Sequence, residues 1–207
     1  APSPVLRLLR KVRGRGVPLG EYVEGKIYRG LLTGLNEAFV IDEATKERLL
    51  AEDPGSAELI KPFLAGDEIK RYVAPHATHS LVCIRNGFTR ERSMGAKEPW
   101  TWLQERYPAV AAHLAPFEAK ARKRADQGEY WWELRSCAYY DEFEKGKIII
   151  PAITKAASYT FDEANAYSND KTSIIPLRDM YLLALLNSKI SDFVLMSSAS
   201  TKQGGFF

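Results

Sequence analysis

Short segments that alternate apolar and polar residues run through this chain, and proline or glycine interrupts them at close intervals. Such alternation is typical of half-buried β-strands. Segments with helical signals lie between them, at 43–50, 57–64 and 99–126, so the sequence predicts an α+β fold rather than a doubly wound parallel sheet. The predicted strands cover residues 18–23, 26–30, 38–41, 69–73, 80–84, 147–151, 159–161 and 172–175.

Three local signals add detail to this prediction. Asp42 has the side chain of a helix N-cap and precedes the helix expected at 43–50. The segment 147–151, with three consecutive isoleucines, predicts a central strand. After Pro176, apolar positions on a broad face predict one long C-terminal helix over 177–196, about 30 Å at 1.5 Å per residue.

Turn and cap residues also divide the middle of the chain. Ser56 predicts the start of a helix at 57–64. Asn86 followed by Gly87 predicts a hairpin turn, and the charged segment 89–98 after it predicts a loop.

The first sixteen residues form a basic lead-in before one folded domain over 17–207. Apolar residues between the cations fit a short amphipathic helix that ends at Gly14, or a linker from a preceding domain. Two roles stay open for it, a solvated lead-in and an arm that contacts phosphates. The cations of the lead-in are Arg7, Arg10, Lys11, Arg13 and Arg15.

Composition excludes several classes of protein. With 207 residues, 45% of them hydrophobic, the chain is long enough for a sizeable core. No apolar run approaches the roughly 18–20 residues of a membrane helix, and the basic opening is unlike a signal peptide. Two cysteines, Cys83 and Cys137, cannot form a disulfide framework. We therefore expect a cytoplasmic protein without a membrane partner.

The two ends of the chain predict a fragment of a longer protein, shortened at its C-terminal end. The chain starts at Ala1 rather than at methionine, and it stops at two large apolar residues, Phe206 and Phe207. On this interpretation, catalytic parts lie outside the chain.

The sequence contains no catalytic motif. A glycine-rich dinucleotide fingerprint, a phosphate-binding loop and a nucleophile elbow are all missing. The cysteines have no zinc-type spacing. His76 and His79 have ligand-like spacing, but no carboxylate stands near them to complete a site, so we expect neither a metal site nor catalytic residues in this chain.

Two alternatives to a binding module for nucleic acid remain open. Glu68 and Lys70 match the Glu-x-Lys pair with which some nucleases hold a divalent metal near a phosphate, although the pattern is common by chance in a charged chain. Trp131 and Trp132 could instead belong to a surface that docks a partner protein, or could fill the core.

Basic and aromatic residues occur together at three places, at 70–72, at Arg85 with Arg90 and Arg92, and at 131–135. Cationic side chains neutralise phosphates, and arginine donates two parallel hydrogen bonds to guanine. These clusters therefore fit nucleic-acid binding, and they fit ordinary solvated surfaces as well.

Residues 28–42, YRGLLTGLNEAFVID, resemble the opening of the TaqI-like C-terminal specificity domain. That domain is the target-recognition part of N6-adenine DNA methyltransferases and of type IIG restriction-modification enzymes. The resemblance covers most of 17–207. Further similar strings follow in the same order, at 60–72, 107–117, 131–135, 143–151 and 181–189.

The resemblance implies a fold and a role. The expected fold is a twisted β-rich part with inserted helices that leads into a long helix. The expected role is recognition of double-stranded DNA at a specific sequence. In such enzymes a methyltransferase domain precedes this one in the same polypeptide, carries Asn-Pro-Pro-Tyr and binds S-adenosylmethionine. This chain lacks that motif, so we expect no cofactor here, and S-adenosylmethionine, with Mg²⁺ if a nuclease is fused, in the parent enzyme.

Recognition residues differ among members of the family because their targets differ, so the predicted DNA contacts rest on physical reasoning alone. They are polar residues of a turn at a strand edge, cations at strand starts or in loops, and residues before a glycine pair where backbone can approach a phosphate. For each of them a solvated or structural role stays open. The predicted contacts are Thr33, Asn36, Lys70, Arg71, Arg90, Arg92, Arg135, Lys147, Lys155, Lys202 and Gln203.

Overall fold

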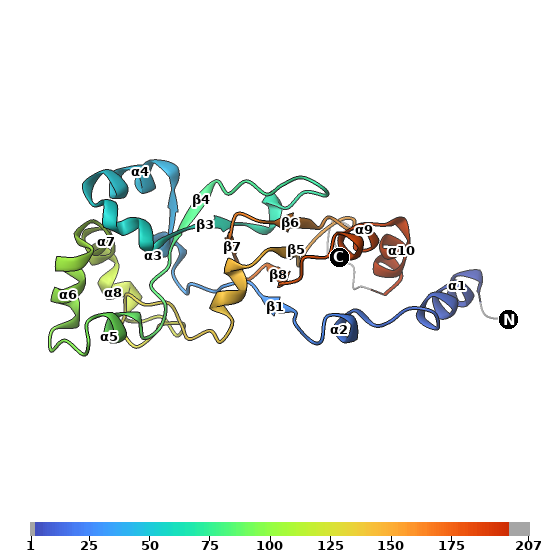
Figure 1. The fold of residues 1–207 in the computed structure, drawn as a ribbon, viewed down its shortest axis with the longest axis horizontal. Coiled ribbons are helices and arrows are strands. Elements are labelled where there is room, and N and C mark those ends of the chain that lie inside the picture. The colour runs from blue at the N-terminus through green and yellow to red at the C-terminus, as the bar shows by residue number, and fades with distance from the viewer. Residues whose placement is uncertain (1–2, 199–207) are drawn as a thin grey trace.

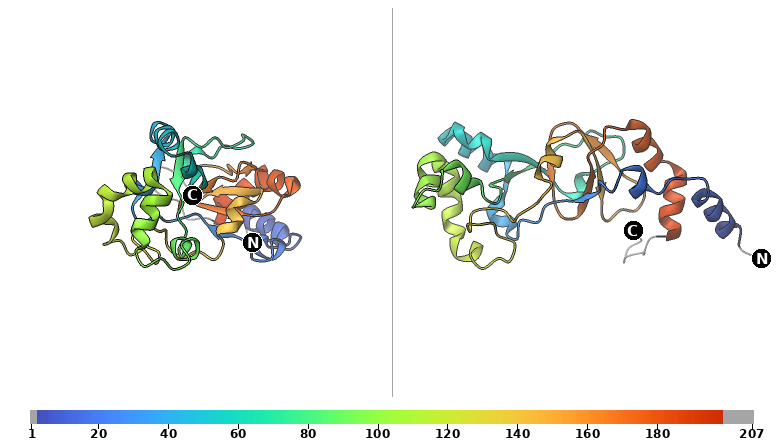
Figure 2. Two further views of the ribbon diagram at one scale, coloured as in Figure 1. Left: turned by 60° about the vertical axis from the view of Figure 1, so that its left-hand side comes forward. Right: turned by 60° about the horizontal axis from the view of Figure 1, so that its bottom comes forward.

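The computed structural model describes residues 3–198 and contains, within them, two four-stranded β-sheets. The molecule is elongated (Figure 1), with a helical lobe at one end, the sheets in the middle and the helices nearest the two termini at the other end. Figure 2 shows the same three parts from two further directions. This arrangement confirms the predicted α+β fold class.

The first sheet is antiparallel and has the order β1-β8-β5-β6. The apolar segment predicted as a central strand is β5, and Ile149 pairs with Ile174 on one side and Thr160 on the other. The strands are β1 (Tyr28–Arg29), β5 (Lys147–Pro151), β6 (Thr160–Asp162) and β8 (Thr172–Ile175).

The second sheet has the order β2-β4-β3-β7, and its β3–β7 pair is parallel. The chain passes from this sheet into the first one between β7 and β8. Here the backbone of Gly30 donates to Thr172 and that of Leu31 donates to Ser168, so the two sheets are joined. The strands are β2 (Val40–Asp42), β3 (Ile60–Leu64), β4 (His79–Val82) and β7 (Tyr167–Ser168).

The helical lobe packs on the second sheet and shares its core. Asp42 caps α4 as predicted, accepting a 2.8 Å hydrogen bond from the backbone of Thr45. Pro108, the first residue of α7, divides the helical region that the sequence predicted at 99–126. The helices are α3 (Asn36–Phe39), α4 (Glu43–Glu52), α5 (Phe88–Arg92), α6 (Pro99–Arg106), α7 (Pro108–Leu114) and α8 (Glu118–Ala121), with 3-10 turns η1 (Pro54–Glu58), η2 (Gly66–Glu68), η3 (Ala115–Phe117) and η4 (Tyr140–Glu144).

The end opposite the helical lobe contains the helices nearest the termini. The basic lead-in forms a helix that ends before Gly14, which is the first of the two forms that its sequence fits. The single helix predicted at 177–196 is divided at Asn187, because the Asn187 side chain hydrogen-bonds both backbone groups of Tyr159, at 3.0 and 2.9 Å. The helices are α1 (Pro4–Arg13), α2 (Leu19–Tyr22), α9 (Met180–Leu186) and α10 (Lys189–Ser198).

Several local predictions were wrong because tertiary contacts override short patterns. Residues 18–23 form α2 rather than a strand. Residues 60–64 form β3 rather than a helix, because they pair with β4 and β7. Residues 69–73 form no strand, since Tyr72 has a φ of +57°. Gly87 caps the start of α5 instead of forming a hairpin turn. Because α5 extends to Arg92, the first part of the loop expected at 89–98 is helical.

Two hydrophobic clusters hold these parts together. The larger one fills the space between the second sheet and the helical lobe and includes Trp131 and Trp132, each 4% exposed. Their burial favours the core role over a surface that docks a partner. The smaller cluster packs Ile148 and Ile175 of the first sheet against Leu182 and Leu183 of α9.

Candidate DNA interface

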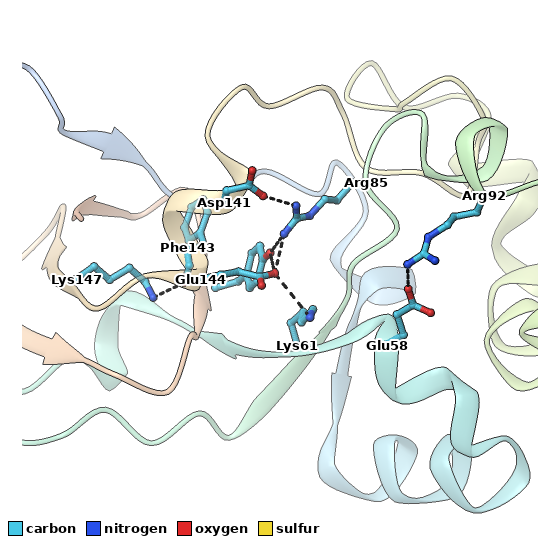
Figure 3. Close-up of polar contacts among 9 residues, drawn as sticks. Glu58, Lys61, Arg85, Arg92, Asp141, Phe143, Glu144 and Lys147 are labelled. Carbon is cyan, nitrogen blue, oxygen red and sulfur yellow. Dashed lines mark hydrogen bonds and ion pairs between the residues drawn. The ribbon is translucent and has the colours of Figure 1, made fainter. Parts of the chain in front are cut away.

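A polar groove of about 490 Å³ lies between α5 and η4, with β3 and the end of η1 as its floor (Figure 3). Charged groups of both signs line it, together with an asparagine amide and two aromatic rings. We call this feature the polar groove. Its lining residues are Glu58, Leu59, Lys61, Cys83, Arg85, Asn86, Phe88, Glu91, Arg92, Cys137, Ala138, Tyr140, Asp141 and Glu144.

Arg85 is the central cation on the η4 side of the groove. Its guanidinium donates to Asp141 and to Glu144, each at 2.7 Å, and to the hydroxyl of Tyr167 at 2.6 Å. The same group lies 5.1 Å from the ring centroid of Tyr140. Arg85 therefore links the segment after β4 to η4 and β7, and its hydrogen bonds commit it to a structural role.

The charges on this side of the groove stabilise one another. Burial opposes the charge of Arg85, but its hydrogen bonds to Tyr167 and Asp141 outweigh that cost, so its pKa is raised. Burial alone would raise the pKa of Glu144. The hydrogen bond from Tyr167 and the cations Lys61 and Arg85 lower it overall, so Glu144 is ionised at neutral pH.

On the α5 side, Arg92 pairs with Glu58 across the groove floor (Figure 3). The Arg92 guanidinium also lies 5.5 Å from the ring centroid of Phe88. Glu58 accepts a second hydrogen bond, 2.7 Å long, from the hydroxyl of Tyr107. Burial and then this hydrogen bond raise the pKa of Tyr107 to about 12, so the hydroxyl keeps its proton.

A buried carboxylate fixes the start of α5. Glu133 has no exposed surface and accepts hydrogen bonds from the backbone of Gly87 and Thr89, both at 2.9 Å. Gly87 has a φ of +81°, which glycine adopts without a steric penalty. The indole of Trp132 donates to the Thr89 hydroxyl at 2.9 Å. The segment 129–133 therefore sets the position of Arg92 at the groove.

Arg124 holds the segment 129–133 in place through hydrogen bonds to its backbone. This side chain donates to the carbonyls of Thr33 at 2.5 Å and Trp131 at 2.8 Å, and also to that of Glu133. It lies 4.3 Å from the ring centroid of Phe39. Arg124 is 7% exposed. The sequence around Arg124 gives no signal for this buried role, because a run of charged residues is typical of a solvated helix face.

The domain that contains this groove matches a known protein family. The TaqI-like C-terminal specificity domain matches residues 61–207, more than half of the chain. The chain belongs to this family. A comparison with curated proteins found no match.

Two solved structures resemble the specificity domain. One is the type IIL restriction-modification enzyme MmeI in complex with DNA, with a TM-score of 0.51, 16% identity and coverage of 79% of this chain and 20% of that one. The other is the type IIG restriction endonuclease BpuSI, with a TM-score of 0.49, 13% identity and coverage of 94% and 23%. The MmeI likeness supports the fold. The specificity domain spans about a fifth of the length of either enzyme.

The predicted contacts do not form one cluster. Arg92 lines the polar groove. Arg90 lies in the same helix and pairs with Glu129 at 2.9 Å. Arg71 pairs with Asp192 of α10 at 3.1 Å, and α5 and α10 lie at opposite ends of the specificity domain (Figure 1).

Other predicted contacts serve local structure. The Thr33 hydroxyl is buried, donates to the Asn36 side chain at 2.6 Å and accepts from the backbone of Leu35. Lys70 donates to the backbone carbonyl of Asp67 at 2.8 Å.

Of the remaining predicted contacts, Arg135 and Lys155 are exposed. Arg135 pairs with Asp126 at 2.9 Å. Lys202 and Gln203 lie outside the described residues.

Lys147 was expected to contact DNA, but it lies in the interior of the protein. Its side chain has no exposed surface and pairs with Asp162. A phosphate cannot reach it in this structure, because its ammonium group is enclosed together with the Asp162 carboxylate and the Phe143 carbonyl. We therefore leave Lys147 out of the candidate interface.

The pair considered for a nuclease also has structural partners. One carboxylate oxygen of Glu68 accepts from the backbone of Ala65 at 2.6 Å, and the other accepts from the backbone and hydroxyl of Thr78. Within residues 3–198 no group of three metal-ligating side chains is present.

A second surface feature lies at the end with the termini. An apolar groove of about 640 Å³ runs between the segment after α1 and the helices α9 and α10, and we call it the apolar end groove. Tyr181 beside it is 76% exposed and Ile190 57%. No helix within the described residues is long and apolar enough to cross a membrane. The groove is lined by Val12, Gly16, Val17, Leu19, Tyr22, Tyr159, Tyr181, Leu182, Leu185, Leu186, Ile190, Ser191, Val194 and Leu195.

Proposed function

We propose that this chain is the part of a site-specific adenine DNA methyltransferase or type IIG restriction-modification enzyme that recognises the target sequence in double-stranded DNA. The observation that carries the proposal is the match of the specificity-domain family to residues 61–207. The MmeI structure, which contains DNA, has a related fold.

The proposed mechanism divides the labour between two parts of one enzyme. Methylation of an adenine requires that the base leave the duplex, at a cost of a few kcal/mol. A separate domain that binds the duplex selects the site at which the base is flipped out. Contacts to phosphates set the register, and contacts to base edges in the major groove distinguish sequences. Groups able to make base contacts line the polar groove.

The residues of this chain do not fit S-adenosylmethionine. The chain has neither a glycine-rich loop nor Asn-Pro-Pro-Tyr. We propose that the methyl donor, and Mg²⁺ if a nuclease is fused, bind to other parts of the parent polypeptide. Because the proposed substrate of the parent enzyme is cellular DNA, we propose that the enzyme is located in the cytoplasm.

The apolar end groove is the surface that fits the preceding methyltransferase domain. A contiguous apolar surface on a monomer is typical of a protein interface. Cations of α1 such as Arg10 and Lys11 are exposed in the helix next to it. We propose that the methyltransferase domain of the same polypeptide packs here.

A salt titration tests the proposed function. A fluorescent DNA duplex is titrated with the chain at several salt concentrations. We expect weak binding whose log affinity falls linearly with log salt, by about 0.9 for each contacted phosphate. No methyl transfer is expected from this chain alone. Binding that is independent of salt, or no binding even when the preceding domain is restored, would contradict the proposal.

A further inference from the structure

We propose that the polar groove reads base edges rather than phosphates, and that Arg92 and Glu58 together determine which base is accepted. This inference rests on the proposed DNA-recognition function. It assigns a binding site to residues that lie on three separate segments of the chain.

The charges of the groove argue against a phosphate site. Carboxylates outnumber cations among its lining residues. A phosphate would be repelled by these carboxylates, whereas base edges in the major groove present both donors and acceptors. Asp141 is 86% exposed, so one of its oxygens can accept from the amino group of cytosine or adenine.

Arg92 differs from Arg85 in how firmly it is held. The Arg85 side chain is 31% exposed and donates to two carboxylates and a hydroxyl. The Arg92 side chain is 59% exposed, and the ring of Phe88 supports the face of its guanidinium. Arg92 can therefore turn toward a guanine and donate two parallel hydrogen bonds to O6 and N7.

Glu58 makes this arginine selective. In the free protein Glu58 neutralises Arg92, which weakens its attraction to any phosphate. When Arg92 turns to a guanine, Glu58 keeps its hydrogen bond from Tyr107. A base other than guanine would bury Arg92 and Glu58 without offering the two acceptors that replace their ion pair. The unpaired buried charges would then cost binding free energy. We expect a preference of roughly 10- to 100-fold at one base pair.

Selection from a random duplex pool tests the inference. The chain is incubated with duplexes of random sequence, and the bound fraction is sequenced. The variants are Arg92→Ala, Arg92→Lys and Glu58→Gln. The matched control is Arg48→Ala, which removes a half-exposed ion pair with Glu52 on α4, outside the polar groove.

Three results would support the inference. Both Arg92 variants lose the preference at one base pair while the preferences at other positions remain. Arg92→Lys does so although it keeps the charge, because lysine lacks the two-pronged geometry. Glu58→Gln binds random duplexes more tightly and discriminates less. The Arg48→Ala variant selects the same sequences as the unmodified chain.

Two results would overturn it. In the first, all groove variants enrich the same sequences as the unmodified chain. In the second, the Arg92 variants keep the sequence preference but lose about 0.9 from the salt slope, as expected for a phosphate contact. If the unmodified chain, with its parent polypeptide restored, binds no duplex at all, the proposed function itself fails.

Discussion

Lys147 and Asp162 form an ion pair that is completely buried between β5 and β6, with Nζ 2.5 Å from Oδ2. Lys147 also donates to the carbonyl of Phe143 at 2.6 Å. Asp162 also accepts from the backbone of Ala164 and Ala166, at 3.0 and 2.9 Å. Burial lowers the pKa of Lys147, and Asp162 opposes this shift. The pair ties the turn after β6 to the central strand.

The first prediction concerns this pair. Lys147→Met leaves the Asp162 carboxylate buried without its cation, so we expect the free energy of unfolding to fall by about 3–5 kcal/mol. Urea unfolding at pH 7 measures the change. Lys145→Met is the control, because Lys145 lies at the surface and pairs with Glu142 there. Its expected effect is within about 0.5 kcal/mol. Equal effects of the two variants would contradict the assignment.

The second prediction compares two glycines. A Cβ at Gly30 would lie 1.9 Å from the carbonyl oxygen of Asn169, so backbone would have to move. A Cβ at Gly20, in α2, would meet nothing within 4 Å. We expect Gly30→Ala to destabilise the protein by about 1–3 kcal/mol or more. Gly20→Ala should stabilise it by up to about 1 kcal/mol. Thermal unfolding of both variants checks the difference in sign.

The third prediction tests the support of α5. Glu133→Ala removes the acceptor for two buried backbone N–H groups, and each unsatisfied group costs about 1–3 kcal/mol. We expect a loss of stability of that order and weaker amide protection at Gly87 and Thr89, measured by hydrogen exchange. Glu129→Ala is the control, because it removes only the ion pair between Glu129 and Arg90 of α5 and leaves the buried acceptor for Gly87 and Thr89 in place. Unchanged protection in Glu133→Ala would show that the carboxylate does not hold α5.

The fourth prediction concerns pH. His113 is half-buried and its Nε2 lies 2.9 Å from the carbonyl oxygen of Ala38. Burial lowers its pKa below the ordinary 6.5, although the bond to Ala38 opposes the shift. Below about pH 6.5 the unfolded state binds a proton that the folded state resists, so stability falls as the pH falls toward the folded-state pKa.

Urea unfolding at pH 7.5 and pH 5.5 checks this sign. His113→Gln removes the titrating group, so the variant should lose less stability than the unmodified chain between these two values. A variant that loses the same amount would exclude His113 as the source of the dependence.

The fifth prediction concerns the apolar end groove. Tyr181→Glu places a charge on the groove where the side chain is 76% exposed. We expect weaker fluorescence of a hydrophobic dye that binds the groove, with a change in unfolding free energy within about 0.5 kcal/mol. Tyr72→Glu is the control, since Tyr72 is 60% exposed outside this groove. Equal losses of dye fluorescence would argue against the groove as an interface.

The sequence by itself determined the features that depend on local chemistry. The three isoleucines within 147–151 predicted a central strand, and β5 has neighbours on both sides. The side chain of Asp42 predicted a cap, and it caps α4. The order of similar strings along the chain predicted the specificity-domain family, which the match to residues 61–207 confirms. Each of these signals acts between residues that are close in sequence or is a property of the order itself.

The tertiary structure decided which residues meet. Arg85 and Glu144 lie 59 residues apart in the sequence, and Arg92 and Glu58 lie 34 residues apart. No local sequence pattern therefore predicts the polar groove. Lys147 has the same charge as the exposed Lys145, but the tertiary structure buries it against Asp162 of β6 and the carbonyl of Phe143. Burial and ion pairing depend on contacts between distant segments, and those contacts form only when the sheets and the helical lobe pack together.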